Sequence, residues 1–109
     1  MAPRSVALDR MFRALADPSR RDIVTRLAER PASISALARP YAMSMSAVFQ
    51  HLKVLEESGL VRSEKVGRVR TCRLDPRALD AIDRWVADHR ARLQRRLDRL
   101  EAYLERRRS

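Results

Sequence analysis

The chain has 109 residues, of which 45% are apolar, so it can bury one hydrophobic core but lacks the length of most enzymes with a large cleft. Its 24 lysine and arginine residues outnumber its 14 aspartate and glutamate residues, and the formal net charge of +10 favours a polyanionic partner. Aromatic residues make up only 5%, which argues against a stacking surface for single-stranded nucleic acid and favours a duplex.

Two amphipathic helices are predicted at the start of the chain. The first lies within residues 1–16 and begins near Ser5. Its apolar residues fall at helical spacing: Leu8, Met11, Phe12 and Leu15. The second begins at Asp17 and Pro18, because aspartate is a preferred N-cap and proline fits the first helical position, and it ends before Pro31.

A helix-turn-helix unit is predicted over residues 33–58. Ser33 caps a short helix over residues 34–38, which Pro40 closes, and a longer helix begins at about Ser44. The longer helix carries its apolar residues on one side: Val48, Leu52 and Leu55. Its other side is therefore free to meet a partner.

A basic β-hairpin is predicted over residues 60–74. Its strands cover residues 60–65 and 69–74, and Gly67 between them permits the positive φ that a tight turn needs. The hairpin holds five basic residues against the single acidic residue Glu64: Arg62, Lys65, Arg68, Arg70 and Arg73. The predicted fold is mainly helical with this small hairpin, and the order of its elements is that of a winged helix-turn-helix.

A long helix is predicted over residues 75–105, opened by Asp75 and Pro76 and free of internal glycine or proline. Its apolar stripe has the spacing of a heptad seam with one stutter: Leu79, Ile82, Val86, His89, Leu93, Leu97, Leu100 and Leu104. A helix of about 30 residues is about 45 Å long, and so small a body cannot cover it. The seam therefore predicts an interface with a partner chain.

The outer side of the helix after Ser44 is expected to enter the major groove of DNA. Ser46 and Gln50 can hydrogen-bond base edges, whereas Ser44 and Lys53 suit phosphates. Phe49 has no polar atom, so it can only touch a thymine methyl group or pack against sugar. In the hairpin, three arginines are expected to grip the adjacent DNA backbone, the alternative for the tip being an ordinary solvated turn: Arg62, Arg68 and Arg70.

Two segments resemble the ArsR/SmtB family of bacterial transcriptional repressors. They are FRALADPSRR at residues 12–21 and SMSAVFQHLKVLEESGLV at residues 44–61, in the family's order and separation. The resemblance implies a homodimeric repressor that binds a short inverted repeat near its own promoter. It places His51 in the recognition helix, as a DNA-contacting or helix-packing residue. It also implies that the first and last helices form the dimer. The apolar spacing of these two helices supplies ten candidate interface residues: Leu8, Met11, Phe12, Leu79, Ile82, Val86, Leu93, Leu97, Leu100 and Leu104.

The sequence departs from the metal-sensing members of that family. The Cys-x-Cys unit of their third helix is replaced by Ser-Ala-Leu-Ala at residues 35–38, and Asp88 and His89 are adjacent, which breaks the Asp-x-His spacing of the second metal site. Residues 85–104 resemble a branch that senses no metal. We therefore predict neither a metal nor a cofactor, and the effector stays unidentified.

The sequence bears on functions other than repression. Without a glycine-rich phosphate loop, a nucleophile and base pair or a metal cluster, the chain is not expected to be an enzyme. Two alternatives remain open, namely a protein-interaction module that uses the last helix and an architectural protein that binds DNA without sequence preference. Cys72 is expected to be a small, partly buried apolar residue, the alternative being an oxidation-sensitive residue of the wing.

The sequence also predicts where the protein acts. Charged residues interrupt the apolar residues of the N-terminal segment, and no uncharged apolar stretch reaches the length of a membrane span. A single cysteine suits a reducing compartment. We therefore expect a cytoplasmic protein with no membrane partner.

Overall fold

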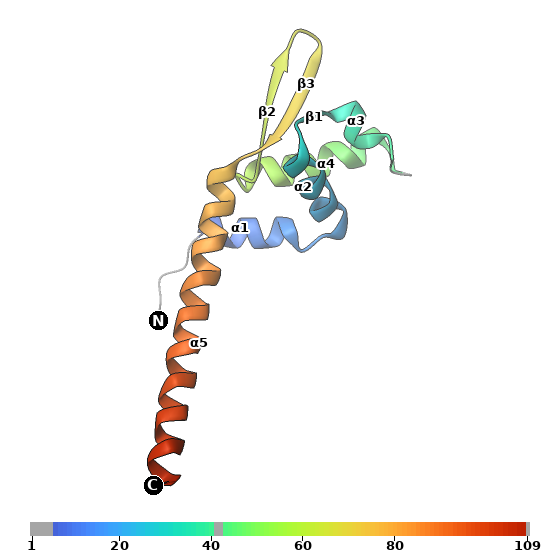
Figure 1. Cartoon of the computed structure of the whole chain (residues 1–109). Helices are drawn as coiled ribbons and strands as arrows, with labels where there is room; N and C mark the ends of the chain where they lie inside the picture. Colours follow the sequence, from blue (N-terminus) through green and yellow to red (C-terminus); the bar gives the residue numbers. More distant parts are fainter. Residues whose placement is uncertain (1–5, 41–42, 109) are drawn as a thin grey trace. The chain divides into compact units, whose positions relative to one another are not determined.

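The computed structural model describes residues 6–40 and 43–108 (Figure 1), so residues 1–5 of the predicted first helix and 41–42 of the helix-turn-helix lie outside the described residues. The chain divides into two units, Met1–Leu79 and Asp80–Ser109. The elements follow in chain order: α1 (Val6–Leu15), α2 (Pro18–Glu29), β1 (Ala32–Ser33), α3 (Ile34–Ala38), α4 (Met45–Glu57), β2 (Val61–Val66), β3 (Val69–Leu74) and α5 (Pro76–Arg108).

Side-chain caps fix where three of the helices begin. Asp17 accepts a hydrogen bond from the Arg20 backbone N–H at 3.0 Å at the start of α2. The hydroxyls of Ser33 and Ser44 accept from the backbone N–H three residues on, at 3.1 and 3.2 Å, at the starts of α3 and α4. Each cap satisfies one of the N–H groups that a helix start leaves without a partner. The predicted starts of these helices are confirmed.

Arginine side chains hold the opposite ends of two helices. Arg20 donates to the carbonyl oxygens of Ala14 at 2.7 Å and Arg13 at 3.1 Å, which belong to the last turn of α1. Arg26 of α2 donates to the carbonyl oxygens of Leu37 and Ala36, each at 2.9 Å, at the end of α3. Cations favour helix C-termini because the last carbonyls lack partners and carry the negative end of the dipole. Two of the chain's positive charges, those of Arg20 and Arg26, therefore bind helix ends within the fold.

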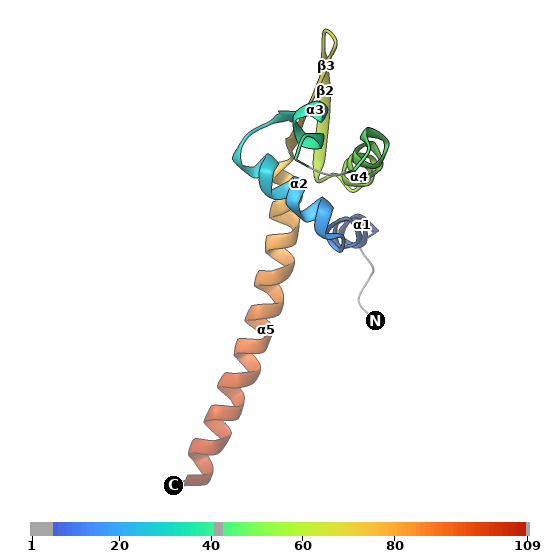
Figure 2. The same ribbon diagram turned by 90° about the vertical axis from the view of Figure 1, so that its right-hand side faces the viewer.

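The core of the first unit draws on every helix and on the sheet. Its buried apolar residues are Met11, Ala14, Ile23, Leu27, Ile34, Leu37, Val48, Leu52, Leu55, Leu60, Val61, Cys72 and Ala78. Figures 1 and 2 show α1 and α4 with nearly parallel axes. The three predicted apolar residues of α4 all lie in this core, so the opposite side of α4 is left at the surface.

The sheet has three antiparallel strands in the order β1-β3-β2, where the sequence predicted two. Strand β1 pairs Ala32 with Cys72 and Ser33 with Thr71. It was missed because two residues are too few to show an alternating pattern, and Ser33 also caps α3. The hairpin turn is two residues long, with Gly67 at φ 63°, as a type II′ turn requires of its first residue. Strand β2 therefore runs one residue later than predicted.

Asp75 joins the hairpin to the start of α5. Its backbone N–H donates to the Leu60 carbonyl oxygen at 2.8 Å, and its carboxylate accepts from the Arg77 backbone N–H at 3.0 Å. The other carboxylate oxygen accepts from Arg62 Nε at 2.7 Å. The hydrogen bond from Arg62 is the main cause that holds the pKa of Asp75 below its ordinary value of 3.8.

Replacement of Asp75 by asparagine is expected to lower the free energy of unfolding at neutral pH, with a smaller difference from the native protein in acid. Since the pKa of Asp75 is lower in the folded chain, its carboxylate stabilises the fold above pH 3.8 and loses this effect as the pH falls through the folded pKa. Urea unfolding at several pH values measures the difference. Glu64→Gln is the control, because Glu64 is exposed and lies 4.0 Å from Arg73. A pH-independent difference for Asp75→Asn would contradict the assignment.

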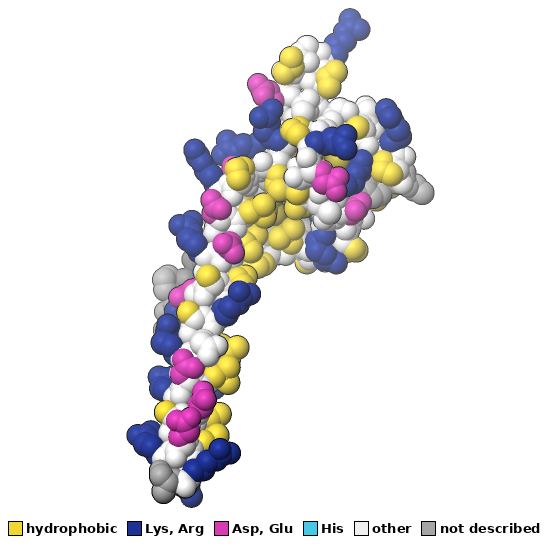
Figure 3. Space-filling model, in the orientation of Figure 1, with side chains coloured by type: hydrophobic (Ala, Val, Ile, Leu, Met, Phe, Trp, Pro, Cys, Tyr) yellow, Lys and Arg dark blue, Asp and Glu magenta, His cyan; other side chains and the backbone are white. Residues whose placement is uncertain are grey.

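The second unit is the continuous helix formed by the rest of α5, which ends at Arg108, three residues beyond the predicted end. Its side chains make local contacts, such as Trp85 stacked on His89 with ring centroids 4.1 Å apart and Arg92 paired with Asp88 at 3.2 Å. Four leucines at seam positions are about half-exposed: Leu93, Leu97, Leu100 and Leu104. Figure 3 shows apolar side chains along one side of this helix, among many charged ones.

Candidate nucleic-acid interface

Helix α4 presents a largely polar face at the surface. Ser46, Gln50 and Lys53 are exposed, and they lie on the side of α4 opposite Val48 and Leu55. Phe49 shares this face and is 50% exposed. Ser44 is exposed at the helix start, where its hydroxyl already serves as the cap. The α4 side chains that the sequence assigned to DNA contact thus share one accessible surface, with the exception of His51.

His51 lies apart from that face. It is half-buried, and its Nδ1 is 3.9 Å from Oδ2 of Asp17, the cap of α2. The Arg20 backbone hydrogen bond lowers the pKa of Asp17 most, and the charge of His51 acts in the same direction. Of the two roles that the sequence left open for His51, helix packing matches this position.

We call the hairpin the wing (residues 61–74). Its two faces have different neighbours. Val61 and Cys72 are buried, so the face that they share is turned toward the helices. Alternation places Arg70 and its cross-strand partner Lys65 on that same face. Figure 3 shows basic side chains around the wing, and Arg68 lies in its turn. Lys65 was not among the predicted contacts, although the period-two pattern of the strand could have identified it.

Arg62 lies on the opposite face of the wing, directly across from Arg73. Its Nε is bound to the Asp75 carboxylate at 2.7 Å, near the base of the wing. The sequence grouped Arg62 with the other basic residues of the hairpin as a DNA contact, whereas the structure shows it on the face opposite Arg70 and bound to Asp75. We therefore assign Arg62 to the support of the wing.

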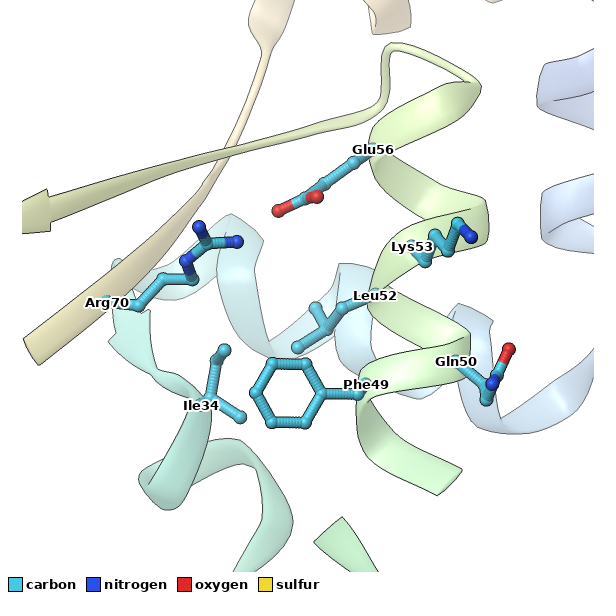
Figure 4. A pocket seen from close by; sticks show the side chains of 7 residues that line it. All are labelled: Ile34, Phe49, Gln50, Leu52, Lys53, Glu56 and Arg70. Atoms are coloured by element: carbon cyan, nitrogen blue, oxygen red, sulfur yellow. The ribbon is translucent and has the colours of Figure 1, made fainter. Parts of the chain in front are cut away.

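A hollow of about 240 Å³ separates α4 from the wing. It is lined by Ile34, Phe49, Gln50, Leu52, Lys53, Glu56 and Arg70. Figure 4 shows Arg70 and Glu56 directed into it from opposite sides, with the Phe49 ring near Ile34 and Leu52. Charged side chains thus surround an apolar floor.

Two further sequence predictions concern Cys72 of the wing and Met11 of α1. The Cys72 side chain is fully buried, and this burial is the main reason that its pKa is raised to about 11. A buried neutral thiol is a poor nucleophile, so its position agrees with an apolar packing role. Met11, predicted at the dimer interface, is only 8% exposed and lies in the core of its own unit.

Residues 6–40 and 43–108 show no grouping typical of a metal site and no membrane span. In that part of the chain, no three His, Cys, Asp or Glu side chains lie close enough to hold a metal ion together. None of its helices combines the length and the apolar character that crossing a membrane requires.

Comparisons with known proteins agree with this geometry. A family model described as a helix-turn-helix domain matches residues 15–64. The HTH-type transcriptional regulator Rv2034 of Mycobacterium tuberculosis is 47% identical over 74 residues, which are 68% of this chain and 69% of that protein.

Solved structures are similar over most of the chain. The crystal structure of the ArsR family transcriptional regulator RHA00566 matches with a TM-score of 0.79 and 38% identity, over 86% of this chain and 97% of that chain. The homodimeric winged helix-turn-helix DNA-binding domain Mb0332 from Mycobacterium bovis, a possible ArsR-family regulator, matches with a TM-score of 0.64 and 26% identity, over 84% and 94% of the two chains. The identity and coverage of these matches confirm the resemblance seen in the sequence, and the chain belongs to the ArsR/SmtB family of winged helix-turn-helix transcriptional regulators.

Proposed function

We propose that this regulator is a repressor that binds a specific double-stranded DNA operator. The proposal is carried by one observation: the exposed face of α4, with Ser46, Gln50 and Lys53, lies beside the wing face that carries Arg70 and Lys65. A major groove admits one α-helix, and basic side chains next to it suit the flanking phosphates. Repression, autoregulation and an inverted repeat rest on the family resemblance. As a cytoplasmic DNA-binding protein, the chain needs no catalytic activity, and its effector is unidentified.

We further propose that the working unit is a homodimer formed by α1 and α5. Its support is the row of half-exposed leucines on α5 (Leu93, Leu97, Leu100 and Leu104), which forms a coiled-coil seam, together with the homodimeric state of the Mycobacterium bovis relative. On α1, Phe12 is 38% exposed, whereas Met11 is buried in the core of its own unit. A monomer that dimerises only with a different protein would favour an interaction module instead.

Selection of bound sequences from a random DNA pool tests the specific operator. The selected duplex should compete far better than random DNA at the same salt concentration, whereas an architectural binder would show no difference. Gln50→Ala is expected to cost about 1 to 3 kcal/mol of operator binding and to relax the preference at one base pair in each half-site. Gln94→Ala on α5, where the amide binds Asp98 at 2.9 Å, is the matched control and should leave affinity unchanged. An equal loss on all sequences would contradict base reading by Gln50.

The salt dependence of binding tests the wing. Arg70→Ala should weaken binding to all duplexes and flatten the slope of log affinity against log salt by about 0.9 per lost phosphate contact, hence about twice that for a dimer. Arg73→Ala is the matched control, because Arg73 lies on the opposite face of the same strand. Fluorescence anisotropy at several salt concentrations gives both slopes. An unaltered slope in Arg70→Ala would exclude Arg70 from the phosphate contacts.

A further inference from the structure

The hollow between α4 and the wing has an apolar floor in the middle of the proposed DNA-binding face. The Phe49 side chain is 50% exposed, whereas its neighbours Ile34 and Leu52 are 7% and 2% exposed. Figure 4 shows the ring directed from α4 toward Ile34, so that it extends the buried apolar surface out to the hollow. An apolar group that covers this half-exposed ring would gain free energy by removing apolar surface from water.

DNA offers few groups that suit this floor. A phosphate in the hollow would meet the Glu56 carboxylate, which is directed into it opposite Arg70. A polar base edge placed against the ring would lose its hydrogen bonds to water without gaining others. The 5-methyl group of thymine is the apolar group that a base presents in the major groove.

We propose that Phe49, seated on Ile34 and Leu52, forms a binding site for a thymine methyl group, and that it makes thymine preferred at one position of each operator half-site. This inference rests on the proposed function and adds a rule for base choice to it. Lys53 and Arg70 flank the hollow and hold the neighbouring backbone, which sets the depth at which the base edge meets the ring. Deoxyribose, the other apolar part of DNA, is the competing occupant.

Replacement of thymine by deoxyuridine tests the site, because it removes the methyl group and changes no hydrogen bond. In the selected operator, each thymine is replaced singly by deoxyuridine, and binding to the native protein is measured. One position per half-site should lose about fourfold in affinity, the change expected for one buried methyl group, and about 16-fold when both half-sites are changed. If the native protein selects a specific sequence but no thymine position shows this loss of affinity, the inference is wrong and the proposed function is unaffected.

Variants of Phe49 identify the residue that reads the methyl group. Phe49→Ala should bind the thymine and deoxyuridine operators equally at that position, whereas Phe49→Leu should keep part of the preference. Met45→Ala removes an exposed apolar side chain of α4 that does not line the hollow, and it should keep the full preference. A preference that persists in Phe49→Ala would overturn the inference. Failure of the native protein to prefer any sequence would overturn the proposed function itself.

Discussion

Replacement of Leu100 by glutamate is expected to convert the protein from a dimer to a monomer and to lower operator affinity by about 100-fold or more. Leu100 is 54% exposed in the single chain and lies in a row with Leu93, Leu97 and Leu104. Burial of a leucine side chain contributes about 1.5–3 kcal/mol, and a carboxylate in its place would be buried without a partner. A monomer can occupy only one half-site, so the gain from joining two binding events is lost. Sedimentation equilibrium and operator titration measure the two effects.

Ala102→Glu is the matched control for this prediction. Ala102 is exposed on the opposite side of the same helix, and the substitution introduces the same charge at a small cost in helix propensity. It should leave the dimer and the operator affinity unchanged. A dimer that survives Leu100→Glu, or that dissociates equally in Ala102→Glu, would exclude the leucine row as the interface.

Replacement of Arg26 by methionine is expected to lower the free energy of unfolding by about 2–4 kcal/mol. Two carbonyl groups at the end of α3, those of Leu37 and Ala36, would lose their charged donors, while methionine keeps much of the length of the side chain. Because these bonds fasten α3 to α2, the loss should appear as a lower midpoint of urea unfolding at fixed chain concentration.

Arg21→Met provides the comparison. The Arg21 side chain is exposed and donates to a single carbonyl oxygen, that of Leu15, at 2.7 Å. Its replacement should cost less than about 1 kcal/mol, since exposed carbonyls regain hydrogen bonds from water. Similar losses of unfolding free energy in the two variants would mean that the bonds of Arg26 stabilise the fold no more than the exposed bond of Arg21.

Local chemistry explains why much of the fold was predictable. Asp17, Ser33 and Ser44 cap their helices through hydrogen bonds that span three residues, so the sequence alone contains both partners. Strand β3 was predicted at its observed bounds, because Gly67 and the start of α5 limit it on both sides. Strand β1 was not, because its identity depends on pairing with β3, about 40 residues away in the chain.

The residues of the candidate site were likewise predictable only where local spacing in the sequence identifies them. Helical spacing identifies the exposed face of α4, with Gln50 and Lys53, without reference to the rest of the chain. The sequence could not identify the arginines that hold helix ends, because Arg20 and Arg26 find their partners only once the elements pack. Strand alternation did carry the information that separates Arg62 from Arg70, and a face-by-face assignment of the hairpin would have used it.

The arginine bonds to helix ends have a consequence for how the protein responds to acid. Neither a guanidinium group nor a backbone carbonyl gains or loses a proton in the range where proteins work, so the bonds of Arg20 and Arg26 persist as the pH falls. Among the described residues, Asp17 and Asp75 are the carboxylates whose pKa is lowered by the fold, and they cap α2 and join the wing to α5. As the pH falls through their lowered pKa values, Asp17 and Asp75 therefore lose the stabilising effect of their charges, whereas the bonds that join α2 to the ends of α1 and α3 do not depend on a titrating group.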